Sequence, residues 1–304
     1  MVIACTSIGM AIVEGIDPAT KKGVILCKVR LLARVHITDK EKAMTATTAT
    51  GSGLAAVRET YQRDGYVLVK GLIEPGEARY MRQELHDLLG RASGARNGAW
   101  KSASSVAGAE GKQRLQGMHD LQFYCSVFSR MIVDPRFTGV AAAVLGAENV
   151  QLHHTKAFIK PPEKGAPFPL HQDRPFFPHT RHRVAAAIFH LDNAPAEKGC
   201  VAVVKGSHHL GPLEHIEEGS WHLPPDEWPV TRAEPVEAEA GDVLIFSYLT
   251  IHGSGVNTSN EARTTWLVQF RDPADLPIGD KHTFSRGQGM MLRGRNPDSS
   301  YGGP

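Results

Sequence analysis

The sequence of 304 residues contains no apolar run of 18 residues, so no transmembrane helix is predicted. The mildly apolar stretch 2–13 has neither a basic segment before it nor a clear small-residue cleavage site after it, which argues against a secretory signal. A surplus of one charge is also missing, because 34 basic residues face 32 acidic ones and the formal net charge is +2. This balance excludes a generally basic nucleic-acid-binding protein.

Cysteine is scarce and scattered. The four cysteines, Cys5, Cys27, Cys125 and Cys200, include no CxxC pair, which argues against a disulfide framework or a zinc site. We therefore expect reduced thiols and a cytoplasmic location. The sequence also lacks a P-loop and a GxGxxG fingerprint, so nothing supports ATP or NAD as cofactor.

What is present is typical of a folded globular protein, with 41% hydrophobic and 22% charged residues. Residues 1–50 differ from the rest and end in a small, polar run typical of a linker. We expect an atypical extension or linker over 1–50, with Met44 as the natural start; the alternative is a genuine extra strand pair that includes 23–29. The main domain is expected over 51–280, and a C-terminal tail over 281–304.

Helices come first in this main segment, and many short strands follow. Helical spacing and end signals predict helices that end near Gly65 and Gly90, then two more over 121–132 and 134–145. Residues 91–117 are expected to form a long loop. The expected strands are 149–160, 168–173, 183–192, 200–204, 242–247, 251–257 and 263–271. This order favours a mainly β fold, an antiparallel sandwich or barrel braced by N-terminal helices.

The last of these strands indicates a cavity. Side chains of a strand alternate between its two faces. One face of 263–271 carries Thr264, Trp266, Val268 and Phe270, and the other carries Arg263, Thr265, Leu267, Gln269 and Arg271. The apolar face suits packing under helices, and the mixed face suits a barrel interior that holds a ligand.

Candidate metal ligands occur in His171-Gln172-Asp173. Residues i and i+2 of a strand share a face, so this segment supplies two members of a 2-His-1-carboxylate iron site. His252 can supply the third, with Ser254 two residues later and Arg263 eleven residues later. A guanidinium beside such a site suits a carboxylate ligand.

With these motifs the chain resembles the phytanoyl-CoA hydroxylase (PhyH) family of Fe(II)/2-oxoglutarate-dependent dioxygenases, over about residues 55–275. Lys205 departs from the proline that is commoner in the family. The motifs that carry the resemblance are Asp64-Gly65-Tyr66-Val67, Lys160-Pro161-Pro162, His171-Gln172-Asp173, Gly199-Cys200, Gly206-Ser207-His208, Ala240-Gly241-Asp242-Val243, His252 and Arg263.

The resemblance implies a double-stranded β-helix (jelly roll, cupin-like) that binds Fe(II), 2-oxoglutarate and O2. It implies that His171, Asp173 and His252 hold the metal. It further implies that Arg263 and Ser254 bind the cosubstrate, with Lys156 and Gln172 lining its pocket. The expected reaction is hydroxylation of an unactivated C–H bond of a small molecule, with release of succinate and CO2.

Several alternatives stay open at this stage. A cupin-like metal enzyme without 2-oxoglutarate is one, and desaturation, epimerisation or cyclisation by the same cofactors is another. The basic cluster at 174–183 fits a solvated loop at the barrel mouth or, alternatively, recognition of an anionic substrate. Residues 91–117 and 209–235 are expected to set specificity, while the substrate and the oligomeric state have no readable signal.

Overall fold

The computed structural model describes residues 51–92, 116–162, 167–218, 220–279 and 285–297. The predicted extension over 1–50 and most of the predicted loop over 91–117 lie outside these residues. The helices are α2 (Gly51–Asp64), α3 (Pro75–Ala92), η2 (Leu121–Phe123), α4 (Ser126–Met131), α5 (Pro135–Leu145), η3 (Arg174–Phe176), η4 (Ala196–Lys198), η5 (Ser207–Leu210) and η6 (Val230–Arg232). No helix within these described ranges is long and apolar enough to cross a membrane.

The strands form two antiparallel sheets. They are β1 (Tyr66–Val69), β2 (Gln116–His119), β3 (Val150–Lys160), β4 (Phe168–His171), β5 (Val184–His190), β6 (Val201–Val203), β7 (Glu234–Pro235), β8 (Val243–Ser247), β9 (His252–Ser254), β10 (Arg263–Arg271) and β11 (Met291–Arg293). The seven-stranded sheet has the order β1-β8-β5-β10-β3-β11, with β2 also paired to β3, and the four-stranded sheet has the order β4-β9-β6-β7. Neighbours in each sheet are mostly far apart in sequence, as expected for a jelly roll. The predicted mainly β jelly-roll fold is confirmed.

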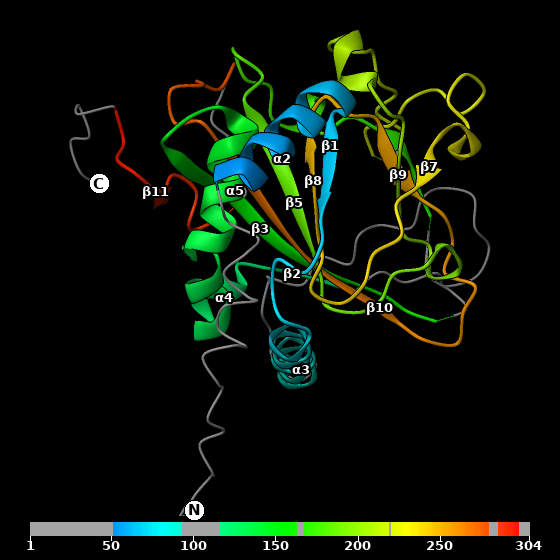
Figure 1. Ribbon diagram of the computed structural model, residues 1–304. Coiled ribbons are helices and arrows are strands. Elements are labelled where there is room, and N and C mark those ends of the chain that lie inside the picture. Colours follow the sequence, from blue (N-terminus) through cyan, green and yellow to red (C-terminus); the bar gives the residue numbers. More distant parts are fainter. Residues whose placement is uncertain (1–50, 93–115, 163–166, 219, 280–284, 298–304) are drawn as a thin grey trace, which may run out of the picture. The chain divides into compact units, whose positions relative to one another are not determined.

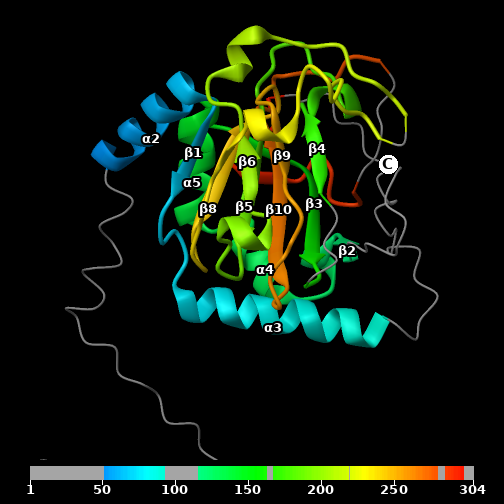
Figure 2. The same cartoon turned by 90° about the vertical axis from the view of Figure 1, so that its right-hand side faces the viewer.

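The larger sheet separates two environments. Helices α2, α4 and α5 lie on one side of it, and the smaller sheet lies on the other (Figure 1). Helix α3 runs crosswise to the strands in Figure 2 and contributes Met81 and Leu85 to the same core as the other helices. This core lies on the helical side of the sheet and leaves the opposite side free to face the smaller sheet.

Strand β10 shows this division residue by residue. Trp266 is fully buried, and its ring centroid lies 5.0 Å from that of Phe128 in α4. On the opposite face, Arg263, Thr265 and Leu267 line a cavity. Both predicted faces of this strand are therefore confirmed.

Local signals explain several element ends. The Asp134 carboxylate accepts a hydrogen bond from the Arg136 backbone N–H at 2.8 Å, and Pro135 occupies the first turn of α5. Gly146 ends this helix with φ +62°, a left-handed conformation that favours glycine.

Three predictions of local structure were wrong, and two short strands were missed. The expected strand over 168–173 ends at His171, because the backbone of Asp173 is in the right-handed helical region, with φ −74° and ψ −22°, at the start of η3. The expected helix over 121–132 is divided into η2 and α4, because the chain is extended at Cys125, where φ is −143°. Strand β2 lies at the end of the predicted loop 91–117 and pairs with β3. Strands β7 and β11 were not predicted, since each is short and is held by a partner distant in sequence.

Candidate metal centre and adjoining anion pocket

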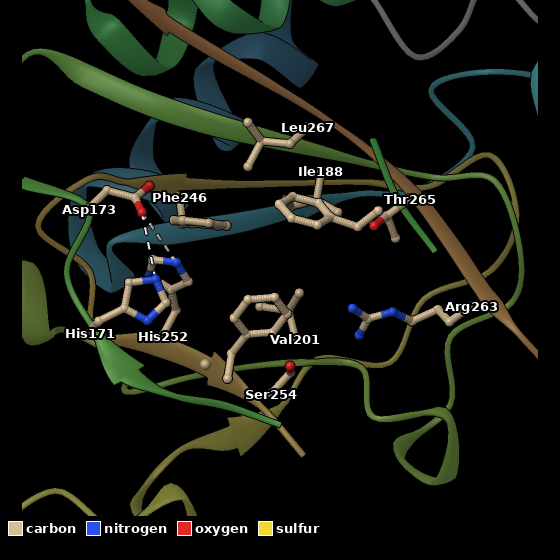
Figure 3. Close-up of a pocket in the computed structure, with 13 residues that line it drawn as sticks. His171, Asp173, Ile188, Val201, Phe246, His252, Ser254, Arg263, Thr265 and Leu267 are labelled. Atoms are coloured by element: carbon tan, nitrogen blue, oxygen red, sulfur yellow. Dashed lines mark ion pairs between the residues drawn. The ribbon is translucent and has the colours of Figure 1, made fainter. Parts of the chain in front are cut away.

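The side chains of His171, Asp173 and His252 converge on one point, although only the two histidines lie in strands of the smaller sheet; Asp173 lies just before η3. His171 ends β4, His252 begins β9, and the two residues are paired in register. Asp173 Oδ1 lies 3.8 Å from His171 Nε2 and 3.7 Å from His252 Nε2. One ligand atom from each residue lies within 4.8 Å of the other two (Figure 3). We call these three residues the triad.

Backbone carbonyls orient both imidazole rings. The Nδ1 of His171 lies 2.9 Å from the carbonyl oxygen of Pro169, and the Nδ1 of His252 lies 3.0 Å from that of Thr250. Because a carbonyl oxygen only accepts, each ring donates from Nδ1 and keeps a lone pair on Nε2. Burial lowers the pKa of His171 to about 3, so the ring stays neutral as metal ligation requires.

A neighbouring side chain and the backbone hold Asp173. Gln269 donates from Nε2 to Asp173 Oδ2 at 3.2 Å, which leaves Oδ1 directed at the two rings. The Asp173 backbone N–H donates to the carbonyl of Tyr248 at 3.0 Å. Hydrogen bonds of this kind fix ligand orientation in metal sites. Two imidazoles and one carboxylate fit iron(II), because this donor set is typical of non-haem iron oxygenases.

A cavity of about 120 Å³ extends from the triad between the two sheets. Besides the triad it is lined by Phe158, Phe168, Ile188, Val201, Phe246, Gly253, Ser254, Arg263, Thr265 and Leu267. Its walls are largely apolar, whereas polar groups are concentrated at its two ends. Figure 3 shows the triad at one end and Arg263 at the other. We call the latter, with Lys160 and Ser254, the cationic end.

Arg263 is a buried cation with few protein partners. It is 4% exposed, and burial lowers its pKa to about 10, so it remains charged near neutral pH. Its Nη1 donates to the carbonyl of Gly199, whereas its Nε has no hydrogen-bond partner among the described residues. None of the ion pairs found in the described part of the chain includes Arg263. A buried guanidinium in this state fits a carboxylate ligand.

Lys160 adds a second buried nitrogen, and sequence reasoning did not assign it a role. Its Nζ donates to Ser254 Oγ at 2.8 Å and to the carbonyl of Gly255 at 2.6 Å. Burial, and secondarily the charge of Arg263, lower its pKa to about 6. Since Ser254 Oγ accepts from Lys160, its own hydroxyl proton is available to a ligand. The signal for Lys160 was the β3–β10 register, which places it opposite Arg263.

Gly199 joins the two buried basic side chains. Its carbonyl accepts hydrogen bonds from both Arg263 and Lys160. Its φ is +62°, and an added Cβ would lie 2.5 Å from the Gly255 carbonyl oxygen. Glycine is therefore required here by both conformation and space.

Lys156 and Gln172 are not among the residues that line the cavity. Lys156 places its Nζ 4.7 Å from the ring centroid of Phe158, a lining residue. Gln172 is fully buried and uses its side-chain amide on three backbone groups, the N–H of Leu213 and the carbonyls of Gly211 and Leu249. Gln172 therefore links the backbone between His171 and Asp173 to the segments that contain Leu213 and Leu249.

The basic cluster at 174–183 is divided between two environments. Asp275 accepts backbone hydrogen bonds from Arg181 and Arg183, and Asp272 forms an ion pair with the Arg183 side chain. Arg174 instead lines a second cavity of about 390 Å³, together with Pro175, Leu213, Glu214, His215 and Trp221. This cavity adjoins the triad segment, because His215 accepts a hydrogen bond from the Gln172 backbone N–H.

Comparison with known proteins gives a consistent result. Residues 61–265 match the family model for phytanoyl-CoA dioxygenase (PhyH). The chain is 23% identical over 253 residues to a probable alpha-ketoglutarate-dependent hypophosphite dioxygenase of Stutzerimonas stutzeri, covering 80% of this chain and 87% of that protein. It is 25% identical over 242 residues to L-proline trans-4-hydroxylase of Streptomyces griseoviridis, covering 71% and 86%.

A solved structure shares the fold. The chain is similar to the epimerase SnoN, solved in complex with Fe3+, alpha ketoglutarate and nogalamycin RO, with a TM-score of 0.62 and 23% identity. The match covers 80% of this chain and 100% of that one.

Proposed function

Because the chain belongs to the phytanoyl-CoA dioxygenase family, we propose that it is an Fe(II)/2-oxoglutarate-dependent dioxygenase that hydroxylates a small molecule. The observation that carries the proposal is one cavity with two different ends. The triad offers two lone pairs and a carboxylate oxygen at one end. At the other end Arg263 is a buried cation to which no described residue offers a carboxylate. A 2-oxo dicarboxylate has complementary groups at its own two ends.

We assign roles to this chain's residues accordingly. His171, Asp173 and His252 would hold iron(II), and Gln269 would orient the carboxylate of Asp173. Arg263 and the hydroxyl of Ser254 would bind the distal carboxylate of 2-oxoglutarate, with Lys160 orienting that hydroxyl. The apolar walls would exclude water from the cosubstrate. Iron(II), 2-oxoglutarate and O2 together supply an oxidant for an unactivated C–H bond, with release of succinate and CO2.

The test is to add 2-oxoglutarate to the Fe(II)-loaded protein without oxygen. Binding is measured by the weak metal-to-ligand charge-transfer absorption of the complex in the visible range. We expect this band in the wild type and its loss in both Arg263→Met and His252→Ala. A wild-type protein that binds iron but gives no such band would favour a cupin-like metal enzyme that does not use 2-oxoglutarate.

For the substrate we propose a small anionic molecule that binds beside Arg174. The Nε of Arg174 is buried and without a hydrogen-bond partner in the described part of the chain, and Trp221 lines the same cavity. The relatives named for hypophosphite and L-proline also act on small molecules with anionic groups. Substrate-stimulated succinate release tests this proposal: carboxylates or phosphorus oxyanions should stimulate the wild type, and Arg174→Gln should raise the concentration required. Stimulation by neutral molecules alone would contradict it.

Hydroxylation is the outcome we propose among those open to this class. The similar SnoN structure is that of an epimerase, so the product must be identified by its mass. A gain of one oxygen atom from labelled O2 supports hydroxylation, whereas an unchanged mass indicates epimerisation, and a loss of two hydrogens indicates desaturation or cyclisation.

Two further proposals concern the extent of the catalytic domain and the location of the protein in the cell. The catalytic domain would span 51–280 and also include β11, which lies within the segment expected to be a tail and pairs with β3.

A cytoplasmic location rests on the free thiols Cys125 and Cys200. Fractionation of the producing cell, with the protein found outside the cytoplasm, would contradict this location.

A further inference from the structure

His190 is a buried polar side chain that the described residues leave without a hydrogen bond. It is the last residue of β5 and is 0% exposed. Neither Nδ1 nor Nε2 of its ring has a partner in the described part of the chain. Buried polar side chains are nearly always hydrogen-bonded, so the described residues leave this ring able to bond a ligand.

Strand register places His190 next to the cationic end of the cavity, directly behind the residues that line it. In the pairing of β5 with β10, Ile188 lies opposite Leu267 and His190 lies opposite Thr265. Ile188, Leu267 and Thr265 all line the cavity. His190 shares the strand face of Ile188 and lies two residues further toward Arg263.

The electrostatic surroundings of His190 favour an anion. Burial, with a further contribution from the charge of Arg263, lowers the pKa of His190 to about 3. The ring is therefore neutral and has one N–H to donate. Among the described residues, Arg263 is the one charged group that shifts the pKa of His190. The nearby carboxylates of Asp192 and Asp242 accept hydrogen bonds from backbone N–H groups, that of Asp192 from Thr264 and that of Asp242 from Gly71 and Glu239.

We propose that His190 is a specificity-determining residue that donates a ring N–H to the distal carboxylate of 2-oxoglutarate, beside the guanidinium of Arg263. The inference rests on the proposed function, because it assigns a further residue to the same cosubstrate pocket. It predicts that His190 distinguishes 2-oxo acids with a distal carboxylate from those without one. A histidine that only fills space in the core would affect both kinds of ligand alike.

The experiment compares two ligands by anaerobic calorimetry on the Fe(II)-loaded protein. 2-Oxoglutarate carries the distal carboxylate, and pyruvate presents the same 2-oxo acid end without it. We expect His190→Phe to weaken 2-oxoglutarate binding roughly tenfold, as for a lost hydrogen bond to a charged group, and to leave pyruvate binding within about twofold. His190→Gln keeps an N–H donor and should restore most of the affinity.

The matched control is Phe189→Leu, which changes a fully buried neighbour on the other face of β5. It should leave both affinities unchanged, and thermal unfolding and iron content report whether each variant folds. Equal weakening of both ligands in His190→Phe and His190→Gln, or no change in either, would overturn the inference. If the wild type itself fails to bind 2-oxoglutarate, the proposed function fails instead, which is a separate result.

Discussion

The two ends of the cavity bury polar groups in opposite ways. At the triad, backbone carbonyls and Gln269 engage the atoms that face away from the centre, so that only two lone pairs and one carboxylate oxygen remain. At the cationic end, Arg263 and Lys160 share one acceptor, the carbonyl of Gly199, and have no carboxylate partner in the described chain. The triad is arranged for a cation, and the cationic end is arranged for an anion. A ligand that bridges both ends must therefore carry chemically different groups.

The largest effect is expected from removing a metal ligand at the triad. His252→Ala leaves two donors where three converge, so we expect iron affinity to fall more than about 100-fold, beyond the usual cost of losing a supporting residue. Calorimetric titration with Fe(II) measures it. The control is His208→Ala, because His208 lies outside the triad and bonds the carbonyl of Gln62. Unchanged iron binding by His252→Ala would refute the assignment of the triad.

Arg263→Met removes the buried charge at the cationic end of the cavity. We expect 2-oxoglutarate to bind about 100-fold more weakly, since truncating one partner of a buried charged pair costs several kcal/mol. Iron affinity should be unaffected, which would separate the two ends experimentally. Arg183→Met is the control, because its ion pair with Asp272 lies at a half-exposed side chain. A parallel loss of iron binding in Arg263→Met would mean that the ends are not independent.

Gln269→Leu tests how much the triad depends on its support. Without the hydrogen bond to Asp173 Oδ2, the carboxylate can turn away, and we expect iron affinity to fall about 10-fold. Competition with a coloured chelator measures this change. If Gln269→Leu binds iron as tightly as wild type, backbone contacts alone hold the triad.

Lys160→Met tests how burying a basic group at the cationic end affects the free energy of unfolding. Lys160 has a folded pKa of about 6, below its ordinary value, so the unfolded chain binds more protons between that pH and about 10.4, the ordinary pKa of lysine. Wild-type stability should therefore rise with pH in this window. Removing this buried amine should stabilise the metal-free protein by about 1–2 kcal/mol near neutral pH, because the unfolded chain then no longer gains a proton there. Urea unfolding at several pH values should show this advantage shrinking as pH rises; a constant difference would argue against a titrating Lys160.

Much of the site was predictable because its signals are local or periodic. His171 and Asp173 were predicted to converge because residues i and i+2 of a strand share a face. They do converge, but Asp173 lies after the end of β4, at the start of η3. The alternation in 263–271 predicts which side of β10 faces the cavity. Arg263 accordingly lies in the predicted lining. The broad order of helices followed by strands was sufficient for the fold class.

The residues that sequence reasoning missed depend on long-range register. Lys160 gains its place only because β3 pairs with β10, and His190 gains its place from the pairing of β5 with the same strand. Gln172 was predicted near the cosubstrate, but its amide is used by backbone groups about 40 to 80 residues away along the chain. A single sequence carries no direct signal for such pairings.

The carbonyl bonds at Nδ1 of His171 and His252 have a consequence for metal selection. They fix a small, rigid set of two nitrogens and one oxygen, and such a set follows the Irving–Williams order rather than rejecting competitors. Copper, nickel and zinc ions would then bind more tightly than iron(II). Which ion the protein carries would depend on supply in the cell or the purification buffer, so chelation and anaerobic reloading decide whether a preparation is active.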